Sequence, residues 1–191
     1  MNMPRHKWIG LLFFLASIQF VIMLIVAETQ YPGYNAGENY ISDLGVWGHD
    51  SAIIFNASII IFGSMVLLGA WLGHKEWGLK APVLLFSISS IGAIGVGIFY
   101  EEIAPYHYIC AFLAFFFGNL GLIAMGRHLS QPLSSISYAF GAIGLTAMFL
   151  YGMEWYLGLG PGGMERMICY PIFGWMMAFG GAAMASRDVV K

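Results

Sequence analysis

Six stretches of predominantly apolar residues, each long enough to cross the hydrocarbon core of a bilayer, dominate this sequence of 191 residues. A transmembrane helix needs about 20 such residues. We place the six stretches at about 8–27, 52–72, 82–100, 107–126, 133–153 and 166–186. Because they take up most of the chain, we expect residues 1–191 to form one transmembrane domain, an all-α bundle of six membrane-spanning helices.

The composition and the motif content support this expectation. Hydrophobic residues make up 59% of the sequence and charged residues 9%, which leaves too little polar surface to cover a soluble core. The first stretch exceeds the roughly 7–15 apolar residues of a signal peptide, so we interpret it as a retained helix. No sequence feature indicates a nucleic acid, nucleotide or haem as a ligand. Cys110 and Cys169 either form a disulfide or stay free.

The charged residues divide between the two ends of such a bundle. Seven of the eight basic residues fall on one side, in the termini and in the second and fourth loops: Arg5, Lys7, Lys75, Lys80, Arg127, Arg187 and Lys191. The positive-inside rule makes that side cytoplasmic. We therefore predict a multi-pass protein of the cell membrane with cytoplasmic termini. Its acidic outer mouth either reflects the exclusion of basic residues from translocated loops or binds a cation or a polar lipid head.

The longest polar interruption is the predicted first outer loop, residues 28–50. Its aromatic and aliphatic side chains favour an ordered loop at the membrane interface. Within it, Asn39–Gly45 has the pattern of a short interfacial helix, which would place Asn39 and Asp43 on one face. Ser42 and Asp43 are also common helix caps, and the sequence leaves the choice between a cap and a binding site open.

Candidate catalytic residues lie where the apolar helices end at this outer side. His107 begins the fourth stretch, and small residues follow it at helical spacing, so its side chain should face protein. Together with Asp43 and Glu101 it has the side chains for acid–base chemistry or for binding a divalent metal ion. A buried histidine that is satisfied by one carboxylate is the simpler alternative.

Other polar side chains near the same mouth are candidate ligand-binding residues: Asn39, Ser42, Asn56, Glu102, Glu165, Arg166 and Tyr170. Asn56 lies near the outer end of the second helix and is expected to bond Asp43 or the loop backbone. Arg166, the one base on the acidic side, is predicted to pair with one of four acids. These acids are Asp43, Glu101, Glu102 and Glu165.

Several of these residues occur in a pattern that resembles a known family. The pattern consists of Pro32-x-Tyr34, Asn39-x-Ile41-Ser42-Asp43-Leu44-Gly45, Asn56, His107, Glu165-Arg166, Pro171 and Trp175. It looks like the prokaryotic six-helix integral-membrane family catalogued as domain of unknown function 998. Ser42-Asp43-x-Gly45 also resembles, more faintly, the damage-regulated autophagy modulator group of six-helix membrane proteins. The first resemblance implies a shared polar set without a known activity: Asn39, Ser42, Asp43, His107, Glu165 and Arg166.

Three function classes fit these features. The first, which we favour, is a pocket that binds a lipid or other amphiphile, or a protein that stabilises a membrane complex as a homo-oligomer or with a partner subunit. The second is a membrane-embedded enzyme, such as a lipid-directed hydrolase, that uses Asp43, His107 and a Glu as metal ligands or as acid and base. The third is a proton- or cation-coupled carrier. Only Gln19 and Asn119 are deep polar residues with strong hydrogen-bonding side chains, which disfavours a carrier.

Overall fold

The computed structural model describes residues 3–191 and consists of helices joined by short loops. The long helices are α1 (Arg5–Thr29), α2 (Ser51–Trp77), α3 (Ala81–Ile98), α4 (Tyr106–Gly126), α5 (Leu133–Gly152) and α6 (Gly160–Ala185). Two 3₁₀ helices, η1 (Ser42–Gly45) and η2 (Arg187–Val189), are short, and the described residues form no strand. All six long helices are long and apolar enough to cross a membrane, which confirms the predicted all-α architecture.

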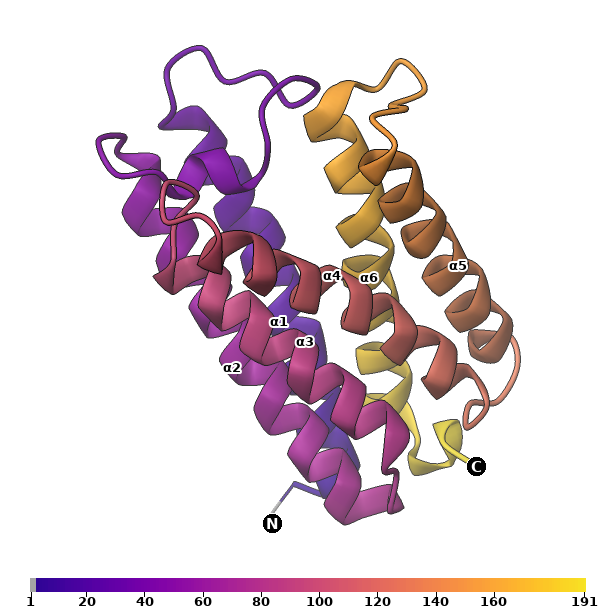
Figure 1. Ribbon diagram of the computed structural model, residues 1–191. Helices are drawn as coiled ribbons and strands as arrows, with labels where there is room; N and C mark the ends of the chain where they lie inside the picture. Colours follow the sequence, from indigo (N-terminus) through magenta and orange to yellow (C-terminus); the bar gives the residue numbers. More distant parts are fainter. Residues whose placement is uncertain (1–2) are drawn as a thin grey trace.

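The six helices close a ring in the order of the chain. Each helix packs against the next, and α6 also packs against α1. Figure 1 shows α1, α2 and α3 on one side and α5 and α6 on the other, with α4 running obliquely between them. Both termini lie at one end of the bundle, and the loop of residues 30–50 lies at the other (Figure 1). This ring surrounds the interior of the protein.

Small residues let neighbouring helices approach closely. A Cβ atom on Gly97 of α3 would lie 2.8 Å from the carbonyl oxygen of Asn56 on α2. A Cβ atom on Gly92 would lie 2.6 Å from the carbonyl oxygen of Cys110 on α4. Such contacts between backbones are how transmembrane helices gain packing energy in lipid.

The two deep amides join helices rather than line a path across the membrane. Nε2 of Gln19 on α1 donates to the carbonyl oxygen of Ser58 on α2 at 3.1 Å. Nδ2 of Asn119 on α4 donates to the carbonyl oxygen of Ile168 on α6 at 3.2 Å. Both amides therefore hold the ring together.

The start of the last helix differs from the prediction. We expected it at residue 166, after a glycine-rich connection, but α6 begins at Gly160 and includes Pro161 in its first turn. Proline fits there because the first turn of a helix has no partner for its backbone N–H groups. The shift of about one and a half turns places Glu165 and Arg166 inside the helix, where they reach the first loop.

Candidate functional site

Arg166 ties the first loop to α6 and to the end of α1. Its Nη2 lies 2.8 Å from Oε1 of Glu28 and donates to the hydroxyl of Tyr34 at 2.6 Å. Its Nη1 donates to the carbonyl oxygens of Ala36 at 2.8 Å, Asn39 at 3.3 Å and Gly162 at 3.0 Å. The guanidinium group thus binds five acceptors, and its forked shape suits this arrangement.

The predicted partners of Arg166 were therefore wrong. The guanidinium bonds none of the four expected acids and pairs instead with Glu28. The reason is geometric, because α1 continues to Thr29 and α6 starts early, so that Glu28 and Arg166 lie on adjacent helices. Burial raises the pKa of Tyr34 to about 12, although Arg166 lowers it. The hydroxyl therefore stays neutral and donates to the carbonyl oxygen of Tyr40 at 2.9 Å.

Asp43 closes the turn that precedes η1. Its Oδ2 accepts bonds from Nδ2 of Asn39 at 2.9 Å and from the backbone N–H of Tyr40 at 3.0 Å. Asn39 thus bonds Asp43, but the helix expected over residues 39–45 begins only at Ser42 and leaves Asn39 outside it. No side chain caps the start of η1, so Asp43 fixes the turn before η1 and does not act as its cap.

Asn56 fixes the other end of the same segment. Its Nδ2 donates to the carbonyl oxygen of Gly45 at 2.9 Å, which confirms the predicted bond to the loop backbone. A Cβ atom on Gly45 would lie 2.5 Å from Oδ1 of Asn56, so glycine is needed at this contact. Asn56 is thus a positioning residue for the loop, and Asp43 is not its partner.

Three carboxyl groups gather below this loop. The buried Glu165 accepts the backbone N–H of Ile41 at 2.5 Å, and Ser42 donates its hydroxyl to Glu101 at 3.4 Å. Burial, together with the neighbouring Asp43 and Glu165 carboxyl groups, raises the pKa of Glu101 to about 8. Glu101 is therefore largely protonated at neutral pH, because burial and like charges both disfavour its ionised form.

His107 lies beside these carboxyls but bonds the backbone. Its Nδ1 is 2.7 Å from the carbonyl oxygen of Phe99, and the residue is only 3% exposed. A carbonyl oxygen only accepts, so Nδ1 carries the proton and Nε2 of the neutral ring is left as an acceptor. The prediction that a carboxylate satisfies His107 was therefore wrong. Within residues 3–191 no side chain forms a hydrogen bond with Nε2.

An apolar space, the inner cavity, occupies the centre of the ring. Its volume is about 60 Å³, and its walls come from α1, α2, α3, α4 and α6. Most of its lining is hydrocarbon and aromatic, including Phe20, Phe62 and Met176. The polar side chains of Ser42, His107 and Glu165 line it as well.

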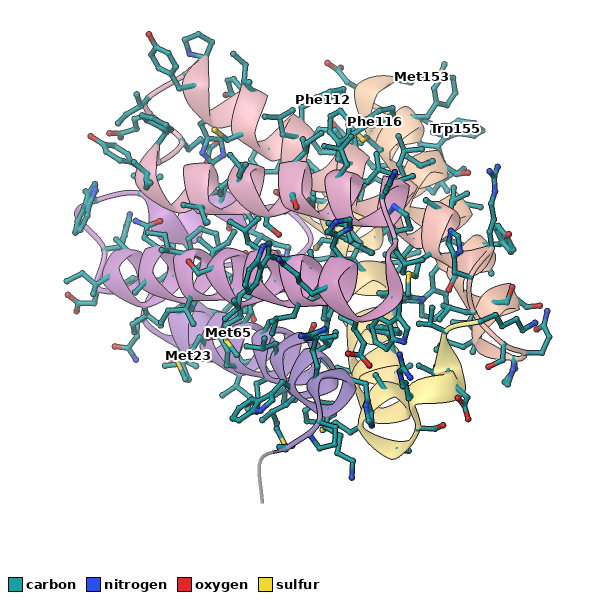
Figure 2. All side chains as sticks on the ribbon, turned by 90° about the horizontal axis from the view of Figure 1, so that it is seen from below. Met23, Met65, Phe112, Phe116, Met153 and Trp155 are labelled. Carbon is teal, nitrogen blue, oxygen red and sulfur yellow. The ribbon has the colours of Figure 1, made fainter. Side chains whose placement is uncertain are left out.

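A second space, the side chamber, adjoins the inner cavity toward α5. Its volume is about 170 Å³, it lies between the first loop, α4, α5 and α6, and Glu101 lines it. The two spaces have five lining residues in common: Ser42, His107, Ala111, Phe115 and Glu165. Tyr108 and Phe112 line the outer part of the side chamber and are 59% and 48% exposed. Figure 2 shows Phe112 at the outer edge of the bundle, on the side where Met153 and Trp155 also lie.

The structure brings together only part of the predicted site. Glu101, His107, Ser42 and Glu165 line the side chamber, whereas Asp43 does not. Glu102 and Tyr170 are exposed and line neither cavity. No group of three or more His, Cys, Asp or Glu side chains in the described chain is arranged to hold a metal ion, so the predicted metal set does not form a metal centre. Both cysteines are free thiols.

Sequence reasoning missed four residues that the structure makes important. Glu28 and Tyr34 hold Arg166, and Tyr40 and Tyr151 both line the side chamber and pack edge to face with ring centroids 6.1 Å apart. The tyrosines are typical of a membrane interface, and nothing local to them indicates a cavity. Only the packing of α5 beside α4 and α6 makes these tyrosines part of the wall of the side chamber.

A ring of six apolar helices around an internal cavity defines a polytopic α-helical membrane protein. The family model described as "Protein of unknown function (DUF998)" matches residues 14–182. The chain therefore belongs to this family of membrane proteins, which confirms the resemblance seen in its motifs. Comparison with curated proteins and with solved structures gave no match.

Proposed function

We propose that the protein binds a lipid or another amphiphile, with the hydrocarbon part in the inner cavity and the polar head in the side chamber. The observation that carries this proposal is the pair of adjoining spaces that share Ser42, His107 and Glu165 at their boundary. Both spaces are mostly apolar, and the side chamber adds Glu101 and three tyrosines to the polar residues that they share. The side chamber is therefore the better place for the head of an amphiphile.

The side chamber also gives a ligand a route from the bilayer. Its outer wall includes Tyr108 and Phe112, whose exposed rings lie on the lateral surface of α4. An amphiphile that enters there would keep its chain in an apolar environment throughout. This route favours a ligand from the membrane over one from water.

Binding is favoured over catalysis by the bonds that the polar groups make. His107 bonds the Phe99 carbonyl, and within residues 3–191 no hydrogen bond joins its ring to Ser42 or Glu101. A hydrolase that activates a serine needs such a bond between base and nucleophile. The carrier alternative has little support, because Gln19 and Asn119 are both engaged with backbone carbonyl groups.

We further propose that the termini are cytoplasmic and that η1 lies at the outer surface of the cell membrane. Arg5 and Arg187 both contact Glu76, at 3.3 and 2.8 Å, so the termini and the α2–α3 loop share the basic end. The positive-inside rule assigns that end to the cytoplasm. In a background without Cys110 and Cys169, an impermeant thiol reagent should label Glu38→Cys in intact cells and Lys191→Cys only after lysis. The reverse pattern would contradict this orientation.

Native mass spectrometry of the purified protein in a mild detergent tests the binding proposal. Wild-type protein should retain one amphiphile that is absent from Ala111→Phe, because Ala111 lines both spaces. Ala142→Phe is the matched control, since Ala142 is exposed on α5 and lines neither space. Circular dichroism and thermal unfolding establish that both variants fold. Equal lipid content in all three proteins, or none in the wild type and no uptake from added lipid, would overturn the proposal.

A further inference from the structure

Aromatic rings form much of the wall of the side chamber. Five of its lining residues are aromatic: Tyr40, Tyr108, Phe112, Phe115 and Tyr151. They come from the first loop, α4 and α5, so that three separate segments contribute rings to its wall. The face of an aromatic ring carries negative electrostatic potential, and a set of such faces is how proteins recognise ammonium groups.

The charged groups of the chamber have the same sign as the ring faces. Glu101 and Glu165 both line it, and no Lys or Arg lines either the chamber or the inner cavity. Arg166 is the nearest base along the chain, and its two terminal nitrogens already bind Glu28, Tyr34 and three carbonyl groups. The carboxyl groups therefore lack a basic partner inside the chamber.

His107 adds an acceptor that has no partner. The residue is 3% exposed and lines both spaces, and its proton is held at Nδ1 by the Phe99 carbonyl. Nε2 thus presents a lone pair. The polar residues that both spaces share are Ser42, His107 and Glu165, and Glu101 adds a second carboxyl group to the side chamber. A buried acceptor without a partner is unfavourable unless a ligand supplies a donor or a positive charge.

We propose, on the basis of the amphiphile site described above, that the head group it selects is a cation of the ammonium class. The ring faces would surround the positive charge, and Glu101 and Glu165 would neutralise it. An anionic head, such as a phosphate or a carboxylate, would meet two acidic side chains and no base. A neutral alcohol would bond the acceptors but gain nothing from the ring faces.

A series of probes that share one hydrocarbon chain and differ in their head group tests this inference separately from the proposed function. Hexadecyltrimethylammonium, hexadecanol and hexadecanoate are mixed in equal amounts with the protein in an uncharged maltoside detergent at pH 9. Native mass spectrometry then gives the relative occupancy of each probe. We expect the ammonium probe to exceed the other two by at least about tenfold, as expected for a charge pair in a partly buried site.

Substitutions in the side chamber should remove the preference for the ammonium head and leave binding of the hydrocarbon chain intact. Glu101→Gln should reduce the ratio of ammonium to alcohol by about tenfold. Tyr151→Leu should reduce it by roughly 3- to 30-fold, which is the range of a desolvated cation–π contact. Glu102→Gln and Phe149→Leu are the matched controls, because both side chains are exposed and line neither space.

The outcomes separate the two proposals. Equal binding of all three probes to the wild type, or preference for hexadecanoate, would overturn the ammonium head and leave the amphiphile site standing. A preference that survives in Glu101→Gln and in Tyr151→Leu would also overturn it. Binding of none of the probes would contradict both proposals.

Discussion

Glu28 on α1 and Arg166 on α6 form an ion pair, with 2.8 Å between Oε1 and Nη2. The pair connects the first helix to the last, which are neighbours in the ring. The same guanidinium also binds Tyr34 and the loop carbonyl groups of Ala36 and Asn39. It therefore positions the loop that carries Ser42 over the polar boundary of the two cavities.

Replacement of Arg166 should destabilise the protein more than loss of one ion pair would. Arg166→Ala should lower the free energy of unfolding in detergent by roughly 2–4 kcal/mol, because Glu28 and the loop carbonyl groups lose a charged donor. Arg166→Lys should recover only part of this, since an ammonium group cannot bind five acceptors in this fork. Denaturant titration followed by circular dichroism measures both variants.

Arg187→Ala provides the comparison for this prediction. Arg187 pairs with Glu76 at 2.8 Å, but its side chain is 63% exposed. An exposed pair contributes only about 0–1 kcal/mol. If Arg166→Ala changed stability no more than Arg187→Ala, the network around Arg166 would not hold the loop.

The contact between α6 and the first loop needs a glycine at position 162. A Cβ atom there would collide with the carbonyl group of Asn39. The backbone N–H of Gly162 also donates to the carbonyl oxygen of Gly37 at 2.9 Å. Gly162→Ala should therefore cost about 1–3 kcal/mol. Gly181→Ala should be neutral or stabilising by up to about 1 kcal/mol, because a Cβ atom at Gly181 meets nothing. The melting temperatures of the two variants measure this difference. Similar melting temperatures would contradict the tight contact at Gly162.

Glu101 should make stability depend on pH. Its pKa of about 8 in the folded protein exceeds the ordinary value of 4.5, so between these values the folded state binds the proton more tightly than the unfolded state. Stability should therefore fall as pH rises from about 5 to 8 and flatten above that range. Melting curves across this range should show a weaker dependence for Glu101→Gln and an unchanged one for Glu102→Gln. A wild type that becomes more stable toward pH 8 would argue against a buried neutral Glu101.

Affinity for an ammonium amphiphile should rise with pH. A cation favours the ionised form of Glu101, so binding releases a proton below the pKa of about 8 and strengthens as pH passes it. Asp43 and Glu165 act on the same carboxyl, and His107 and Tyr151 line the same chamber. Titration with hexadecyltrimethylammonium between pH 6 and pH 9 measures the effect, because this probe does not titrate. The affinity of Glu101→Gln for the probe should depend less on pH. A pH dependence equal to that of the wild type would mean that another group is responsible.

Part of the site followed from local sequence patterns. The spacing of Asn39 and Asp43 placed them on one face, and the depth of Asn56 led to its bond with the loop backbone. Each of these contacts depends on a short spacing or on position along a single helix. The partner of Arg166 did not follow, because a pairing across 138 residues depends on which helices are neighbours. His107 bonds the carbonyl oxygen of Phe99 at the end of α3, and no side-chain pattern indicates a backbone partner.

The sequence alone determined that six apolar helices cross a membrane and that polar residues gather at one end, because hydrophobic length and charge are properties of each segment. It also carried the pattern of its family. Only the tertiary structure decided where α6 begins, which acid pairs with Arg166, and that Tyr40 and Tyr151 wall a chamber beside His107. These features depend on the closure of the ring between α1 and α6, which brings together residues that no local pattern connects.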